Sequence, residues 1–255
     1  MDRRKRFTSS TEVGLESSAN AAQQRLRSLG SPEQAAILAR FFKTGPGQYG
    51  EGDRFIGVKV PVTRQVAKEF QGLPLPEVES LLHSAIHEER LLALVILVGQ
   101  FEKGDDATRK PIYDCYLANT RHINNWDLVD LSAPQVVGGY LESRSRKPLD
   151  RLAKSASPWE RRISIVATHW FIRHGDFVDT IRIAATLLAD KEDLIHKAVG
   201  WMLREVGKRD VRVLEDFLSE HCRTMPRTML RYAIERFPEE ERRKYLNGKV
   251  KMPRQ

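Results

Sequence analysis

Apolar residues recur along nearly the whole of this chain with the period of an α-helix, and no run typical of a β-strand appears. Helix-start signals recur as well. Ser31-Pro32-Glu33-Gln34 and Ser157-Pro158-Trp159-Glu160 each combine a capping serine, a proline in the first turn and Gln or Glu at the third position. Val60-Pro61 and Leu75-Pro76 mark further starts, because a residue before proline is disfavoured in helix. The pattern predicts an all-α protein.

The helical segments repeat. Three of them close with a basic residue followed closely by aspartate, at Lys103-Gly104-Asp105, His174-Gly175-Asp176 and Lys208-Arg209-Asp210. These aspartates are 71 and 34 residues apart, which fits a unit of about 35 residues. Such a period favours a solenoid of stacked, HEAT-like antiparallel helix pairs with a concave surface, with a compact irregular bundle as the alternative.

Charge and composition restrict the classes of partner. The 255 residues include 42 Lys and Arg against 34 Asp and Glu, an excess that fits a polyanionic partner such as nucleic acid, with a generally charged, soluble surface as an equal alternative. The two cysteines, Cys115 and Cys222, lie far apart, so we expect a reduced, cytoplasmic protein. The longest apolar run, Leu91 to Gly99, is too short to span a membrane. The basic and then Ser-, Ala- and Gln-rich residues 1–27 are expected to be a loosely ordered arm.

One motif brings an aromatic ring next to a carboxylate. In Trp126-Asp127-Leu128-Val129-Asp130 the first and last side chains are four residues apart and share one helix face. An enzyme can use such a pair to hold a sugar and stabilise a positive charge on it. The alternative is structural: Trp126 anchors the core and Asp130 is a solvated or capping carboxylate.

A second tryptophan lies on the basic face of a predicted helix, residues 193–208. Trp201 falls about 130° from the centre of the apolar stripe on an ideal wheel, and its neighbours on that face are Lys197, Arg204 and Lys208. An aromatic among cations suits a nucleic-acid surface, whereas packing of Trp201 on the next repeat is the alternative. The apolar stripe consists of Ile195, Ala198, Val199, Met202, Leu203 and Val206.

Two more basic clusters stand at predicted helix starts, where backbone N–H groups also favour phosphate. They are Arg161-Arg162 and the segment from Pro226 to Arg231, which includes Arg227. The chain contains no Walker loop, Gly-rich dinucleotide motif, HExxH, nucleophile elbow or Cys/His cluster. We therefore expect no metal and no nucleotide cofactor.

With these motifs together, the chain resembles the AlkD-like DNA alkylation repair glycosylases. The resemblance rests on four stretches in the family's order, covering roughly residues 30–246. They are Arg54-Phe55-Ile56-Gly57-Val58-Lys59-Val60-Pro61, Trp126-Asp127-Leu128-Val129-Asp130, Trp159-Glu160-Arg161-Arg162 and Lys197-Ala198-Val199-Gly200-Trp201-Met202-Leu203-Arg204-Glu205. The implied organisation is an N-terminal arm at 1–27, a repeat domain at 28–248 and a tail at 249–255.

The resemblance implies a C-shaped solenoid that holds duplex DNA on a basic concave face, without flipping the damaged base. The implied reaction, which starts base excision repair, is cofactor-free hydrolysis of the N-glycosidic bond of purines alkylated at N3 or N7. Asp130 matches the catalytic aspartate, and Trp126 and Trp201 match the sugar-contacting tryptophans. Arg162 matches an arginine that contacts DNA near the lesion. The remaining expected DNA contacts are Arg161, Lys197, Arg204, Lys208 and Arg227, and the expected assembly is a monomer.

Two departures from the family pattern affect local DNA contacts. The position before the motif tryptophan, often aromatic in the family, is Asn125, and the loop from Thr44 to Asp53 is longer and richer in glycine than in some members. Two other functional classes stay open. A non-catalytic binder of branched or damaged DNA would use the same surface, and a protein–protein scaffold would show no salt-sensitive DNA affinity.

Overall fold

The computed structural model describes residues 18–249, and within that range the chain folds into helices with no strand. The first half contains α1 (Ala19–Arg27), α2 (Pro32–Phe41), α3 (Val60–Glu69), α4 (Leu75–Leu82), α5 (His87–Lys103), α6 (Asp106–Ala118), a 3₁₀ turn (Thr120–His122), α7 (Trp126–Ala133), a π-helical segment (Pro134–Gly138) and α8 (Gly139–Leu141). The second half contains α9 (Lys147–Ala153), α10 (Pro158–Ala167), α11 (His169–Arg173), α12 (Val178–Thr186), α13 (Asp193–Gly207), α14 (Val211–His221), α15 (Arg227–Ala233) and α16 (Glu239–Leu246).

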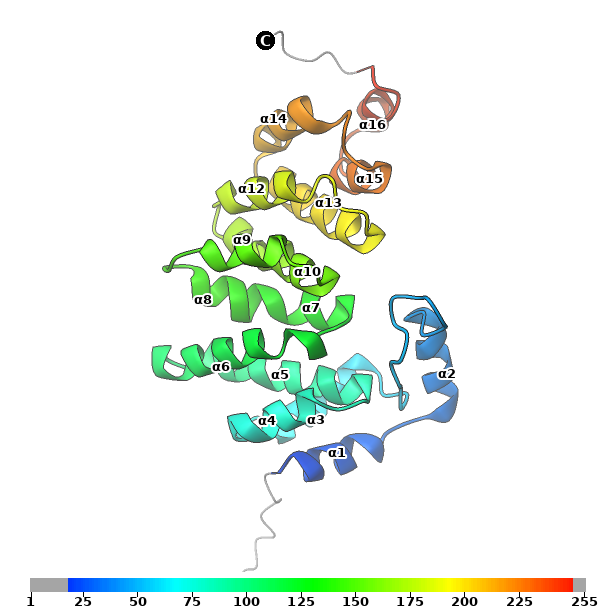
Figure 1. Cartoon of the computed structure of the whole chain (residues 1–255), viewed down its shortest axis with the longest axis vertical. Helices are drawn as coiled ribbons and strands as arrows, with labels where there is room; N and C mark the ends of the chain where they lie inside the picture. Colours follow the sequence, from blue (N-terminus) through cyan, green and yellow to red (C-terminus); the bar gives the residue numbers. More distant parts are fainter. Residues whose placement is uncertain (1–17, 250–255) are drawn as a thin grey trace, which may run out of the picture.

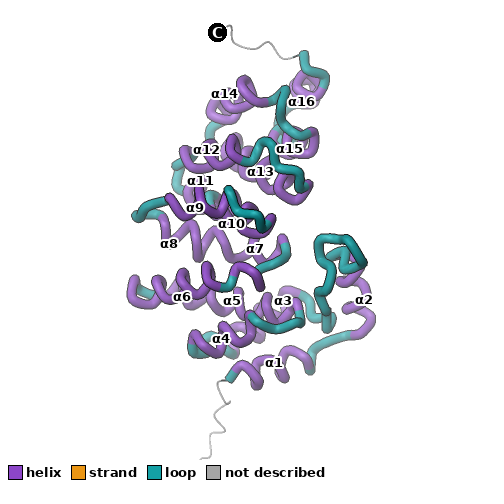
Figure 2. Tube along the Cα trace, in the orientation of Figure 1, coloured by secondary structure: helices purple, strands orange, loops and turns teal. Residues whose placement is uncertain are grey.

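The helices stack in chain order along the long axis of the molecule, from α1 at one end to α16 at the other (Figures 1 and 2). Each helix packs mainly on helices one to three elements away in the chain, as in a solenoid. The predicted all-α solenoid is confirmed. Helix α2 departs from this order, since α2 and the loop that follows it stand beside the stack (Figure 1). None of its residues is fully buried.

The sequence signals for helix starts correspond to real caps. Ser31 and Ser157 accept hydrogen bonds from the backbone N–H groups of Gln34 and Glu160, at 3.3 and 3.5 Å. Two of the three repeating aspartates have the same role, since Asp105 caps α6 and Asp210 caps α14. Asp176 instead precedes the N-cap residue of α12, Phe177, and accepts from the Val178 N–H at 3.2 Å. The spacing found in the sequence therefore corresponds to the starts of α6, α12 and α14.

The N-terminal boundary expected from the sequence is wrong in part. Residues 19–27 were assigned to the loose arm, but they form α1, which buries Ala22 and Leu26 completely. Ser18 caps the helix, and the Ala19 N–H donates to Glu77 of α4 at 2.7 Å. Alanine favours helix and packs without losing side-chain entropy, so a polar composition did not prevent folding. Residues 1–17 of the expected arm, and all but Lys249 of the expected tail, lie outside the described residues.

Helix α5 forms the centre of the first half and is buried on nearly all sides. It contains the apolar run from Leu91 to Gly99, which contacts α3, α4, α6 and α7. A helix surrounded by neighbours needs apolar residues on every face, which explains why this run lacks a polar stripe. Among residues 18–249, no helix is long and apolar enough to cross a membrane.

Helices α13 and α15 approach closely at Gly200. A Cβ atom there would lie 2.5 Å from the Met229 carbonyl oxygen and 2.5 Å from the Tyr232 Cβ. Both neighbours belong to α15, and the first is backbone that cannot rotate away. Glycine at this position therefore sets the distance between the two helices.

We predict that Gly200→Ala lowers the free energy of unfolding by about 1–3 kcal/mol, because overpacking outweighs the helix-propensity gain of roughly 1 kcal/mol. Urea denaturation followed by circular dichroism measures the change. Gly72→Ala is the matched control, since a Cβ at Gly72 meets no atom within 4 Å. A Gly200→Ala protein as stable as the wild type would contradict the close approach.

Candidate active site

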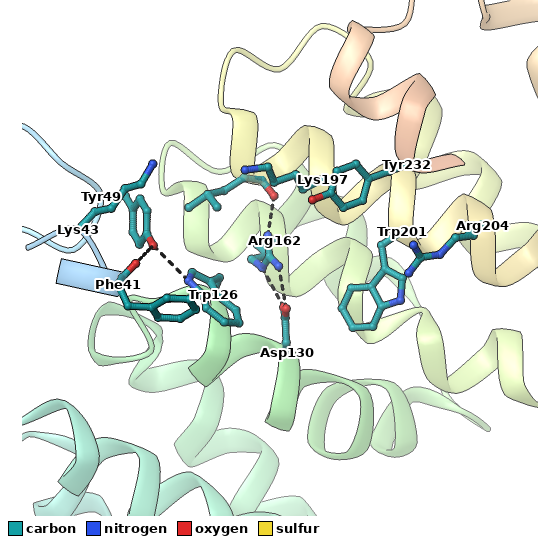
Figure 3. A pocket seen from close by; sticks show the side chains of 11 residues that line it. Phe41, Lys43, Tyr49, Trp126, Asp130, Arg162, Lys197, Trp201, Arg204 and Tyr232 are labelled. Atoms are coloured by element: carbon teal, nitrogen blue, oxygen red, sulfur yellow. Dashed lines mark hydrogen bonds and ion pairs between the residues drawn. The ribbon is translucent and has the colours of Figure 1, made fainter. Parts of the chain in front are cut away.

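A cavity of about 520 Å³ opens between the stack and the α2 arm, which consists of α2 and the loop that follows it. Its walls come from α2 and its loop on one side, from α7 and α10 at the base, and from α13 and α15 on the other side. The lining residues are Phe41, Lys43, Tyr49, Trp126, Asp130, Arg162, Leu194, Lys197, Trp201, Arg204 and Tyr232 (Figure 3). The cavity thus combines five aromatic rings, four cations and a single carboxylate.

The start of α7 positions the motif tryptophan and aspartate. Asn125, fully buried, is the N-cap: its Oδ1 accepts from the Trp126 N–H at 2.9 Å, and its Nδ2 donates to Asp53 at 3.1 Å. Trp126 is therefore the first helical residue, and Asp130 follows one turn later on the same face. An aromatic residue at position 125 would fill this space without making either hydrogen bond.

Asp130 is held by Arg162 in a two-pronged ion pair between α7 and α10. Nε of Arg162 lies 2.8 Å from Oδ1 and Nη2 lies 2.7 Å from Oδ2. The remaining Nη1 donates to the Leu194 carbonyl of α13 at 2.5 Å. Arg162 is nearly buried, whereas the Asp130 side chain keeps 18% of its surface exposed, toward the cavity. Each carboxylate oxygen retains a second lone pair for a water or a ligand.

Burial raises the pKa of the Asp130 carboxyl above its ordinary value, and the Arg162 guanidinium opposes that shift. The paired geometry favours the ionised form of Asp130. The site therefore presents a negative charge in an otherwise cationic and aromatic cavity, where a positive charge on a ligand would be stabilised.

The two tryptophans lie on either side of Asp130 (Figure 3). Trp126 stacks on Phe42 with ring centres 5.4 Å apart, and its Nε1 donates to the Tyr49 hydroxyl at 3.4 Å. Trp201 is half-buried on α13, while all six residues of the predicted apolar stripe are buried on the opposite side. Its ring packs on the core and also lines the cavity, and its predicted contact with nucleic acid stays a prediction.

A buried polar cluster beneath Trp126 connects the α2 loop to α7. His87 of α5 lies between two carboxylates, with Nδ1 3.0 Å from Asp53 and Nε2 2.9 Å from Asp127. Asp53 also pairs with Arg90 at 2.5 Å. Burial lowers the pKa of His87, but its two carboxylate partners outweigh that effect and raise the pKa to about 9. His87 is thus an imidazolium at neutral pH.

The sequence-predicted site residues separate into two groups. Asp130, Trp126, Trp201, Arg162, Lys197 and Arg204 all line the cavity. The other three predicted DNA contacts lie outside it and have partners of their own. Arg161 pairs with Asp190, Lys208 pairs with Glu205, and Arg227 donates to the Leu246 carbonyl.

Five lining residues were not singled out from the sequence. Phe41, Lys43 and Tyr49 belong to the α2 arm, and Leu194 and Tyr232 belong to α13 and α15. Their only signal in the sequence is the Gly-rich loop from Thr44 to Asp53, which contains Tyr49. Within residues 18–249, no group of three His, Cys, Asp or Glu side chains is arranged to hold a metal ion.

One family model matches most of this chain. A family model described as DNA alkylation repair enzyme matches residues 22–237. A solved structure, described as a predicted DNA alkylation repair enzyme from Enterococcus faecalis, is similar with a TM-score of 0.65. It is 17% identical, and the match covers 82% of this chain and 97% of that one. A search of curated proteins finds no match.

The His87 cluster predicts a stability change at alkaline pH. A pKa raised from about 6.5 to about 9 adds stability that is complete below pH 6.5 and is lost as the pH rises through 9. We expect the free energy of unfolding to fall by roughly 2–3 kcal/mol between pH 6.5 and 9. Urea titrations at several pH values measure this loss.

In His87→Gln the same titrations should show little change over that range. His174→Gln is the control, because His174 is exposed and should leave the wild-type pH dependence intact. An identical pH dependence in His87→Gln and the wild type would rule out the proposed charge of His87.

Proposed function

The chain belongs to the DNA alkylation repair enzyme family, and we propose that within it the protein is a monofunctional DNA glycosylase. Its proposed substrates are cationic N3- or N7-alkylated purines, such as 3-methyladenine and 7-methylguanine, in duplex DNA. Removal of the base would initiate base excision repair. The observation that carries the proposal is the Asp130 carboxylate, held by Arg162 in a cavity between Trp126 and Trp201.

The chemistry requires stabilisation of a cation more than activation of a leaving group. An alkylated purine already carries a positive charge, so the base departs readily and leaves an oxocarbenium-like deoxyribose. Asp130 would stabilise that charge and accept a proton from, or orient, the attacking water. The faces of Trp126 and Trp201 would hold the sugar and add a cation–π contribution. None of these steps needs a metal or an organic cofactor.

The lining residues favour recognition of the sugar and phosphates over recognition of the base. No Asn, Gln, Ser or Thr side chain is among them, so the amide and hydroxyl groups that read base edges are absent from the lining, and the cations that remain also bind phosphates. Lys197 and Arg204 instead supply positive charge beside the rings. We therefore propose that the damaged base stays in the duplex while the cavity receives its backbone. The protein would act as a monomer in the bacterial cytosol.

One observation favours a second candidate, a non-catalytic binder of damaged or branched DNA. Both oxygens of Asp130 already accept hydrogen bonds from Arg162, so the carboxylate also has a purely structural use in joining α7 to α10. Such a binder would retain affinity for branched or mismatched DNA and release no base from any alkylated substrate. The same base-release assay therefore separates the two functions.

We predict that Asp130→Asn reduces the single-turnover rate of 7-methylguanine release from methylated duplex DNA by about 100-fold or more, because the charge that stabilises the sugar cation is removed. Chromatography of released bases measures the rate. Asp114→Asn is the matched control, since Asp114 is exposed and lies outside the cavity. A rate equal to that of the wild type in Asp130→Asn would refute this mechanism.

The pH dependence of base release offers an independent test. Only ionised Asp130 is active in the proposed mechanism, so the rate should fall as the pH is lowered through the pKa of this group. Because burial raises that pKa, the inflection should lie above the ordinary aspartate value of about 3.9.

The variant Arg162→Gln removes the opposing positive charge and should move the same inflection to higher pH. Spontaneous depurination, measured without protein, is subtracted at each pH. A pH profile that is flat down to pH 4 in both proteins would show that Asp130 does not titrate in the rate-limiting step.

A further inference from the structure

Lys43 differs from the other cations of the cavity in having no anionic partner within the described part of the chain. Arg162 pairs with Asp130, Lys197 pairs with Asp193 at 2.8 Å, and Arg204 pairs with Glu235. No carboxylate of residues 18–249 pairs with Lys43, whose side chain is exposed at the mouth of the cavity. Its ammonium is therefore the lining charge that remains available to a ligand.

The backbone of Lys43 is held in a conformation that lysine rarely adopts. Its φ is +53°, and no other non-glycine residue of the described chain has a positive φ. The left-handed conformation is unfavourable for a residue other than glycine and persists only where its surroundings impose it. Here the Lys43 carbonyl accepts from the Gly50 N–H at 3.2 Å, and Thr44 N–H donates back to Ala39 of α2 at 3.2 Å.

The loop that imposes this conformation is closed by a glycine. A Cβ at Gly50 would lie 2.2 Å from the Phe42 carbonyl oxygen, so only glycine allows the loop to return this closely to Lys43. At its far end the loop is fixed by Asp53, which is buried against His87, Arg90 and Asn125. The loop is thus fixed at both ends, and Lys43 lies where it leaves α2.

Tyr49 completes the arrangement at the cavity wall. Its hydroxyl donates to the Phe41 carbonyl at 3.3 Å and accepts from Trp126 Nε1 at 3.4 Å. The Lys43 ammonium lies 5.9 Å from the centre of the Tyr49 ring. In Figure 3 these side chains stand on the Trp126 side, facing Lys197 and Tyr232 across the cavity.

We propose that Lys43, supported by Tyr49, is a phosphate-binding site for one DNA phosphodiester beside the lesion. The proposal rests on the proposed function, since it gives the strand within that cavity a second point of attachment. A phosphodiester suits the site because a single exposed ammonium on a flexible stem binds one anionic oxygen without demanding a fixed geometry. The strand would then pass between Lys43 on one wall and the α13 cations on the other.

The test uses equilibrium binding of a duplex of about 20 base pairs with one tetrahydrofuran abasic analogue, which cannot be turned over. Lys43→Gly removes the ammonium and also suits the positive φ, so the fold should stay at least as stable as in the wild type. We expect binding weaker by about tenfold at low salt. The slope of log K against log salt should become shallower by about 0.9, the value for one phosphate contact.

Two further variants separate charge from structure. Lys43→Arg keeps the cation and should restore both the affinity and the salt slope. Lys103→Ala removes an exposed lysine at the opposite end of α5 from His87 and should change neither. An unchanged salt slope in Lys43→Gly would overturn the proposal.

A scan with single methylphosphonate linkages identifies the contacted phosphate. Neutralising that phosphate should weaken binding by the wild type but not by Lys43→Gly, whereas equal losses in both proteins at every position would overturn the proposal. Base release by the wild type is measured separately. If the wild type releases base normally and Lys43→Gly leaves the affinity and the salt slope unchanged, the phosphate site alone is rejected. If Lys43→Gly lowers both as expected but the wild type releases no base, the glycosylase function alone is rejected.

Discussion

The Arg162 guanidinium joins three successive layers of the solenoid at the base of the cavity. It bonds the Asp130 carboxylate of α7 through two nitrogens and the Leu194 carbonyl of α13 through the third, while its own helix is α10. A planar fork of donors can make these contacts simultaneously, which the ammonium of a lysine cannot do. The position of the one carboxylate in the cavity therefore depends on the packing of three helices.

A second set of buried charges fixes the opposite wall. Asp53, at the end of the α2 loop, is shared by His87, Arg90 and Asn125, and the last of these caps the helix that carries Trp126. Burying so many charges is favourable only when each is paired. The cost of leaving a member unpaired keeps the loop, α5 and the start of α7 in one arrangement, even though α2 buries no residue completely.

The elements that are encoded locally could be predicted from the sequence. The serine caps, the prolines after Val60 and Leu75, and the apolar stripe of α13 each depend on residues within one or two turns, and all correspond to the structure. Trp201 could be placed off its stripe for the same reason. The polar composition of residues 19–27 was misleading because it concealed a small alanine face that packs well.

The parts of the site that escaped prediction depend on distant partners. Tyr49 reaches Trp126 across 77 positions, and His87 meets Asp53 and Asp127 at separations of 34 and 40. The sequence predicts Arg161 as a DNA contact, but its guanidinium forms an ion pair with Asp190 in the structure. Local sequence patterns contain no information on such pairs. The arginines that line the cavity can therefore be distinguished from those that connect helices only when the fold is known.

The cavity has one property that the solenoid itself lacks. Contacts within the stack are mainly between neighbouring helices, whereas the cavity wall runs from Phe41 to Tyr232. In such a chain either end can open without the other, because little couples them. A molecule bound against both walls adds a direct link between the two ends, and its binding energy is lost if either end unfolds. Occupancy would thus make the first and last thirds of the protein unfold as one unit.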